Sequence, residues 1–88
     1  MNVEQMLLNN GHEGVVYLVN YDYSDAIIGI THDERLVYDF QKMVEWLVVE
    51  EEFTEIEALE WIEYNTIRAL PYMGEGAPII MYSLEKDL

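Results

Sequence analysis

Apolar residues fall into short β-branched segments in some parts of this chain and follow a helical three-to-four-residue period in others. Residues 14–20 are rich in β-branched and aromatic side chains and predict a largely buried strand. Residues 26–31 and 36–38 are apolar on either side of a polar stretch, so together they predict a β-hairpin. Residues 78–82 predict a last strand, whose leading proline suits a sheet edge because it has no N–H to donate.

A helix is predicted immediately after the hairpin. Asp39 is its expected N-cap, because the carboxylate can accept hydrogen bonds from the free amides of the first turn. The apolar stripe of this helix recurs at i, i+3, i+4 and i+7 and consists of Phe40, Met43, Val44 and Leu47. Glu50, Glu51 and Glu52 follow at its end, where carboxylates interact unfavourably with the helix dipole.

A second helix is predicted from a capping box, the pattern in which Thr54 and Glu57 each satisfy a backbone N–H of the other. Its expected inner face consists of Ile56, Leu59, Ile62, Thr66 and Leu70. Pro71 is expected to end the helix, because the residue before a proline is biased away from helical backbone. Residues 3–8 predict a further short helix, which the turn-forming sequence Asn-Asn-Gly would stop.

The predicted order is therefore one short helix, three strands, two helices and a last strand, which indicates the α+β class. Strands joined by tight turns are antiparallel, so we expect a small antiparallel sheet of three to four strands with a helical hairpin packed on one face. A chain of 88 residues has room for one hydrophobic core, so residues 1–88 are expected to form a single domain.

Charge changes this picture more than any motif does. The chain carries 18 Asp and Glu against four Lys and Arg, a net charge of −14. Residues 43–67 hold eight of these carboxylates and no Lys or Arg. Such a surface repels nucleic acid and anionic membranes and attracts basic surfaces, so the expected partner is a basic protein that normally handles nucleic acid. The expected partner-binding residues are Glu50, Glu51, Glu52, Glu57, Glu60 and Glu63.

Two other interpretations of these residues remain open. The acidic helices can be a solvated face that only confers solubility, although such faces usually mix both signs of charge. Alternatively, the protein can be a homodimeric accessory or scaffold protein that pairs through a tyrosine-rich sheet face or an edge strand, since the chain has seven tyrosines. A charge-driven complex loosens as the ionic strength rises, whereas an apolar dimer does not.

The sequence contains few residues or motifs that are typical of catalytic, cofactor or metal sites. There is no cysteine, and His12 and His32 are the only histidines. Neither a nucleophile elbow nor a phosphate-binding glycine loop is present, so we expect no enzyme, no cofactor and no metal. Asn65 and Arg68 share a helix face and form the best local candidate for an anion site, but internal pairing of Arg68 with neighbouring acids is the favoured interpretation. No apolar run is long enough to span a bilayer, which favours a cytoplasmic location.

Residues 26–82, and especially 36–47, 63–72 and 77–82, carry a resemblance that covers about two-thirds of the chain. In these segments the sequence resembles small acidic hypothetical proteins of phages and prophages of Gram-positive bacteria. The resemblance implies a mobile-element setting inside a host bacterial cell and carries over no catalytic residues. By analogy with anti-CRISPR and anti-restriction inhibitors that imitate DNA, it implies that a nucleic-acid-binding host protein is the target.

The excess of negative charge predicts that salt stabilises the fold. Raising NaCl from about 0.01 M to about 1 M shortens the Debye length from about 30 Å to about 3 Å, which screens the repulsion among carboxylates. We expect the thermal midpoint, measured by circular dichroism, to rise across this range. A midpoint that stays constant or falls would show that self-repulsion does not limit stability.

Overall fold

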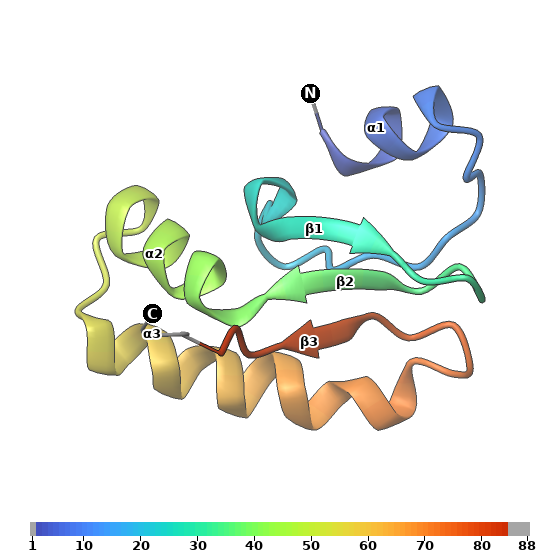
Figure 1. Cartoon of the computed structure of the whole chain (residues 1–88). Coiled ribbons are helices and arrows are strands. Elements are labelled where there is room, and N and C mark those ends of the chain that lie inside the picture. Colours follow the sequence, from blue (N-terminus) through green and yellow to red (C-terminus); the bar gives the residue numbers. More distant parts are fainter. Residues whose placement is uncertain (1, 85–88) are drawn as a thin grey trace.

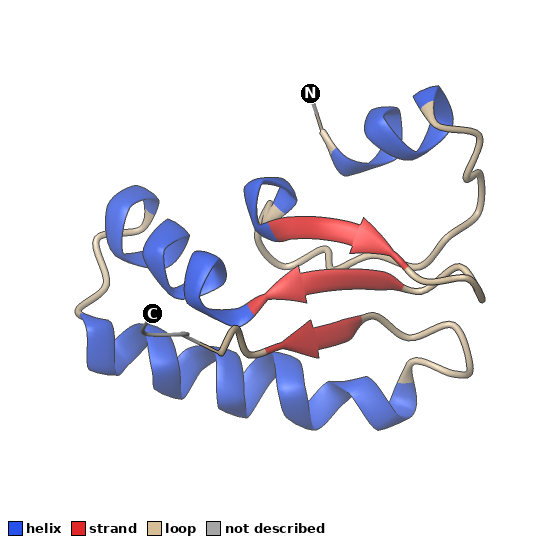
Figure 2. Ribbon diagram, in the orientation of Figure 1, coloured by secondary structure: helices blue, strands red, loops and turns tan. Residues whose placement is uncertain are grey.

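The computed structural model of the chain describes residues 2–84. Figures 1 and 2 show the elements along the chain. They are α1 (Val3–Asn9), a 3-10 helix (Ser24–Ala26), β1 (Ile27–Ile30), β2 (Leu36–Asp39), α2 (Phe40–Glu50), α3 (Glu55–Trp61), a π-helical turn (Ile62–Thr66), a second 3-10 helix (Ile67–Tyr72) and β3 (Ile79–Met81). Helices and a three-stranded sheet together give an α+β fold.

The sheet has the strand order β1-β2-β3. β1 and β2 form the predicted antiparallel hairpin, with Ile27 opposite Tyr38 and Ile30 opposite Leu36. β3 instead runs parallel to β2, so the sheet is mixed and the prediction of a wholly antiparallel sheet is wrong. The reason is the connection: β3 follows β2 through the helices, and such a crossover brings the chain back in its original direction, unlike a tight turn.

α2 begins directly at the end of β2, and α3 with its continuation runs back along the length of the sheet (Figure 1). α2 contacts β2, α3 and the 3-10 helix Ser24–Ala26. Coverage of one sheet face by a helical hairpin stays a prediction. Asp39 caps α2 as expected, because its carboxylate accepts the N–H of Lys42 at 3.2 Å.

Residues 14–20 do not form the predicted strand. Gly11 and Gly14 both have positive φ values, of 77° and 82°, and the chain continues from them in irregular form. The N–H of Leu18 donates to the hydroxyl oxygen of Tyr38 at 3.1 Å, so a side chain takes the place of a ladder partner. β-branched composition indicated burial here, and Leu18 is indeed buried, but a strand also requires a neighbouring backbone to pair with.

The core lies where α2, β2 and α3 meet. Met43, Val44 and Leu47 are buried as the stripe on α2 predicted, and Phe40 is half-buried. The fully buried side chains outside α2 include those of Tyr38, Ala58 and Ile62. In the described part of the chain, no helix is both long and apolar enough to cross a membrane.

The inner face of the second predicted helix is rotated from the expected one. Ile62 and Thr66 are buried as predicted, but Ile56 is 68% exposed and Leu59 is 37% exposed. The row that faces the core runs from Ala58 through Ile62 to Thr66 in steps of four residues. A small alanine carries little weight in a hydrophobic pattern, so the larger Ile56 and Leu59 determined the predicted face.

Two buried tyrosines give a matched test of hydrogen bonding in this core. Tyr38→Phe removes the acceptor of the Leu18 N–H, and we expect the free energy of unfolding to fall by about 1–3 kcal/mol. The Tyr23 hydroxyl is buried without a hydrogen-bond partner among residues 2–84, so Tyr23→Phe should leave stability unchanged or raise it. Urea denaturation of both variants measures the difference, and equal losses would contradict this account.

Candidate functional site

The six predicted carboxylates lie in two groups, both of them exposed. Glu50 is the last residue of α2, Glu51 is its C-cap, and Glu52 follows in the connection to α3. The second group lies on α3 and on the π-helical turn that continues it, and it consists of Glu57, Glu60 and Glu63. The residues are therefore distributed over the end of α2, the following loop and the length of α3.

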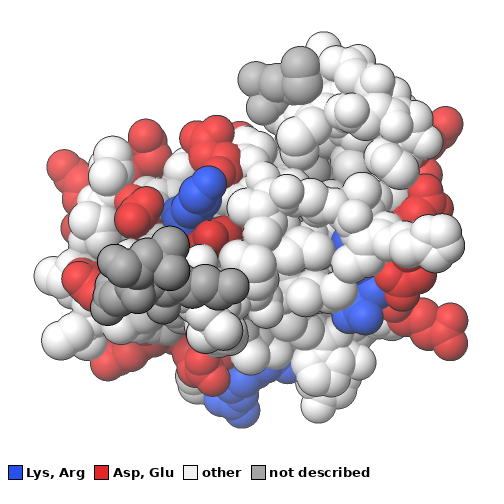
Figure 3. All heavy atoms as spheres, viewed as in Figure 1, with Lys and Arg blue, Asp and Glu red and all other residues white. Residues whose placement is uncertain are grey.

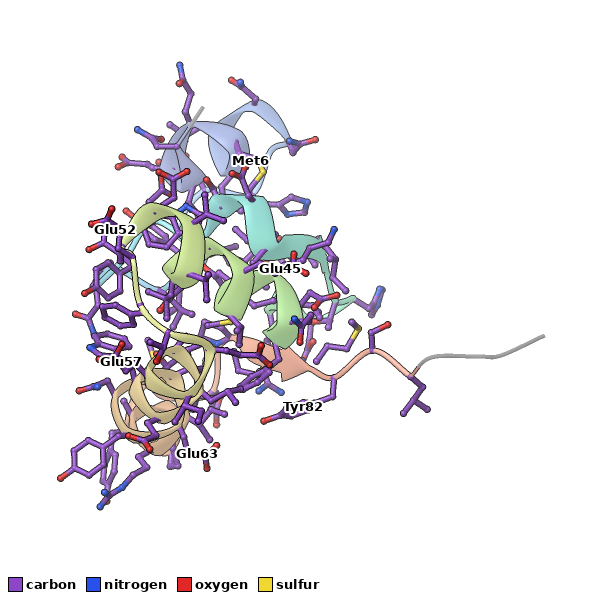
Figure 4. All side chains as sticks on the ribbon, turned by 90° about the vertical axis from the view of Figure 1, so that its left-hand side faces the viewer. Met6, Glu45, Glu52, Glu57, Glu63 and Tyr82 are labelled. Carbon is purple, nitrogen blue, oxygen red and sulfur yellow. The ribbon has the colours of Figure 1, made fainter. Side chains whose placement is uncertain are left out.

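Acidic side chains gather over this part of the molecule, which is on the left in Figure 3. Figure 4 looks at the same end directly: Glu52 and Glu57 lie toward one edge, Glu45 lies nearer the centre, and Glu63 lies below. The carboxylates thus wrap around the end of the molecule. They do not form a single flat row.

The turn after α2 has a backbone that presents its carboxylates outward. Glu52 has a φ of 57°, in the left-handed region that non-glycine residues rarely adopt, and this reverses the chain. The N–H groups of Glu51 and Phe53 both donate to the carbonyl oxygen of Leu47, at 3.1 Å and 3.2 Å. Glu50 and Glu51 are consequently held beside the carbonyl end of a helix, where negative charge is unfavourable.

Glu57 has a structural role as well as an exposed charge. Its carboxylate oxygen Oε1 accepts the backbone N–H of Thr54 at 2.9 Å, and its own N–H donates to Thr54 Oγ1 at 3.1 Å. This is the capping box that the sequence predicted. The hydrogen bond from the Thr54 backbone, followed by that of the Thr54 side chain, lowers the pKa of Glu57. The carboxylate therefore stays ionised to lower pH, and its charge cannot be reversed without loss of the cap.

An aromatic cluster holds the two acidic groups in place. The Tyr21 ring lies 5.7 Å from Trp46 on α2, 4.8 Å from Trp61 on α3 and 6.3 Å from Phe53 in the loop between them, measured between ring centroids. Because these contacts join α2, the loop and α3, the carboxylates lie on elements that pack against one another. Tyr21 and the buried Tyr23 and Tyr38 are thus structural, which the sequence analysis left undecided.

A shallow open groove of about 990 Å³ runs along α3, and the sequence analysis did not predict it. We call it the α3 groove. Its lining is mostly apolar and aromatic, and includes Phe40, Phe53, Leu59, Trp61, Tyr64 and Tyr82. Glu57, Glu60 and Glu63 also line it, so half of the predicted binding residues border an apolar surface. The available signal was the excess of large apolar residues on the second helix over what one buried face can accommodate.

The structure does not bear out a joint anion site of Arg68 and Asn65, because each side chain has a separate contact within the helical segment. The guanidinium of Arg68 lies over the Tyr64 ring, 4.6 Å from its centroid. Asn65 donates from Nδ2 to the carbonyl oxygen of Trp61 at 3.0 Å, so it serves its own helix. The expected pairing of Arg68 with a neighbouring carboxylate is also not observed: within residues 2–84 the ion pair is that of His12 with Glu34, at 3.0 Å. No group of three or more His, Asp and Glu in this range is arranged to hold a metal ion.

Comparison with known proteins gives no relative. No protein-family model matches the chain, and neither a curated protein nor a solved structure is significantly similar to it. The residues and their geometry therefore carry the functional argument alone.

The unfavourable position of Glu50 and Glu51 at the end of α2 leads to a prediction about thermal stability. We expect Glu50→Lys combined with Glu51→Lys to raise the thermal midpoint, because lysines interact favourably with the last carbonyl groups of a helix. The matched control is Glu13→Lys combined with Glu75→Lys, which changes the net charge equally at exposed positions outside the helices. The control should raise the midpoint less. An equal rise would show that only net charge matters.

Proposed function

We propose that this protein is a non-enzymatic binding protein that presents a carboxylate surface to a basic, nucleic-acid-handling protein. One observation carries the proposal. All six residues Glu50, Glu51, Glu52, Glu57, Glu60 and Glu63 are exposed, and none forms an ion pair within the described residues. An acidic surface that only confers solubility usually mixes both signs of charge, whereas residues 43–67 contain no Lys or Arg and α2 adds only the exposed Lys42 at its start.

The packing of α2 against α3 supports the same proposal. Carboxylates held by α2, α3 and the aromatic cluster around Tyr21 present a fixed pattern of charge, whereas a flexible acidic tail would have to be ordered on binding. A basic groove that accommodates phosphates is complementary to such a pattern, and long-range attraction accelerates the encounter. In a phage setting within a bacterial cytoplasm, the partner would be a host protein such as a CRISPR or restriction nuclease, which the bound protein would inhibit by imitating DNA.

A second candidate function rests on the edge of the sheet. β1 is an outer strand of the sheet with α1 beside it (Figure 1), and its residue Ile28 is 45% exposed, so a second copy of the chain can make apolar contact with this side of the sheet. That homodimer would serve as an accessory or scaffold protein. It differs from the first candidate in a measurable way, because its contact is little affected by salt.

The test of the proposed function is capture of partners from bacterial lysate by the tagged protein, washed at low and at high salt. We expect to capture a basic nucleic-acid-binding protein that high salt and added duplex DNA both release, since DNA would compete for the basic groove of that partner. Recovery of the protein alone, or of a partner that survives high salt and excess DNA, would contradict the proposal.

Variants separate binding from folding. Against the captured partner, Glu60→Lys combined with Glu63→Lys should weaken binding at least tenfold, because each reversal places like charges together. Glu50→Lys combined with Glu51→Lys should also weaken binding while it stabilises the fold, a combination that unfolding cannot explain. The control pair Glu13→Lys and Glu75→Lys should bind nearly as well as the parent protein, as measured by biolayer interferometry. Equal losses in all three variants would show that only net charge is recognised.

A further inference from the structure

The α3 groove has an apolar surface that a purely charge-based contact does not need. Leu59 and Tyr82 line it and are 37% and 57% exposed, and the Tyr82 ring lies 4.7 Å from that of Phe40. Figure 4 shows Tyr82 beside α3; this residue directly follows β3 in the chain. Large apolar side chains that remain exposed together mark an interaction surface, since single exposed residues of this kind are ordinary but a continuous lining is not.

The border of the groove determines the charge of its occupant. Glu57, Glu60 and Glu63 line it from α3 and the π-helical turn, and among residues 2–84 the one basic residue of the lining is Arg68, which is already stacked on Tyr64. An acidic peptide, a nucleic acid or an anionic membrane would meet like charge here. A second copy of this chain is disfavoured for the same reason, since each copy carries a net charge of −14.

From these two features we propose that the α3 groove binds an amphipathic, basic helix of the partner protein. Apolar side chains at i, i+3, i+4 and i+7 of such a helix would lie on the groove, and flanking Lys and Arg would meet the carboxylates along its border. The lining extends from Phe53, just before α3, along α3 and its helical continuation to Arg68, roughly 20 Å at the rise of a helix, which matches three to four turns of a bound helix. This inference rests on the proposed function and specifies the partner's chemistry.

The probe is a synthetic amphipathic helix of leucine and lysine about four turns long. Its control is a peptide of the same composition in scrambled order, which has equal charge but no apolar face. We expect the amphipathic peptide to bind at least tenfold more tightly than the scrambled one, as measured by calorimetry and by intrinsic fluorescence, to which Trp61 in the groove and Trp46 both contribute. Equal affinities would overturn the proposal, because charge alone would then explain binding.

Two tyrosines provide the matched variants. Tyr82→Ser removes an aromatic ring from the groove, whereas Tyr72→Ser removes one that is 89% exposed and lies outside its lining. We expect the first to weaken binding of the amphipathic peptide at least fivefold and the second to change it less than twofold. Circular dichroism checks that both variants fold. If Tyr82→Ser does not fold, Leu59→Ser tests a second position in the groove. Equal effects of the groove and control variants would overturn the proposal.

The two proposals can fail separately. If Glu60→Lys with Glu63→Lys abolishes capture of the natural partner but Tyr82→Ser and Leu59→Ser do not, the carboxylate surface stands and the helix-binding groove is wrong. If the natural partner is not basic but the amphipathic peptide still binds in the groove, the proposed function is wrong as stated. A dimer of this chain that the peptide dissociates would show that a second copy is the occupant, which also overturns the inference.

Discussion

Tyr38 is the residue on which the rest of the fold depends, because four segments meet at it. It lies on the central strand opposite Ile27 of β1 and Ile80 of β3, and its hydroxyl accepts the N–H of Leu18 from the irregular segment before the hairpin. The side chain is fully buried, and this burial raises its pKa to about 12. One phenol therefore connects the sheet to a segment that has no strand partner of its own.

The acidic surface is a consequence of how α2 ends. A left-handed residue at Glu52 and the capping box at Thr54 and Glu57 together turn the chain from one helix directly into the next. The aromatic contacts of Tyr21 then fix the two helices to each other. Carboxylates at the end of α2 oppose the helix dipole, so this region is less stable than its backbone would allow. Such a conflict between stability and side-chain chemistry is common at sites of recognition.

Local features of the fold could be predicted from the sequence, and features that depend on distant contacts could not. The hairpin, the cap at Asp39 and the capping box at Thr54 each depend on residues a few positions apart, and each was predicted correctly. The parallel direction of β3 depends on the crossover through the helices, which brings the chain back before it pairs with β2, and the irregular course of residues 14–20 depends on a hydroxyl twenty residues away. The exposure of Ile56 depends on packing against other elements, which periodicity cannot specify. The candidate carboxylates could be selected from the sequence because they follow one another in a short stretch. The groove beside three of them could not, because its lining comes from distant parts of the chain.

The parallel pairing of β2 with β3 also determines the order in which the molecule can assemble. The β1–β2 hairpin closes a short loop, whereas β3 can pair with β2 only after the whole connection through α2 and α3 has been brought back along the sheet. Contacts of such long sequence separation form slowly, because the entropy of closing the loop is lost before any contact compensates for it. The α3 groove takes Phe40 from the start of this connection and Tyr82 from just beyond β3. Its two sides therefore come together only when this long connection has closed, so the groove depends on the most distant strand pairing in the sheet, whereas the negative charge does not.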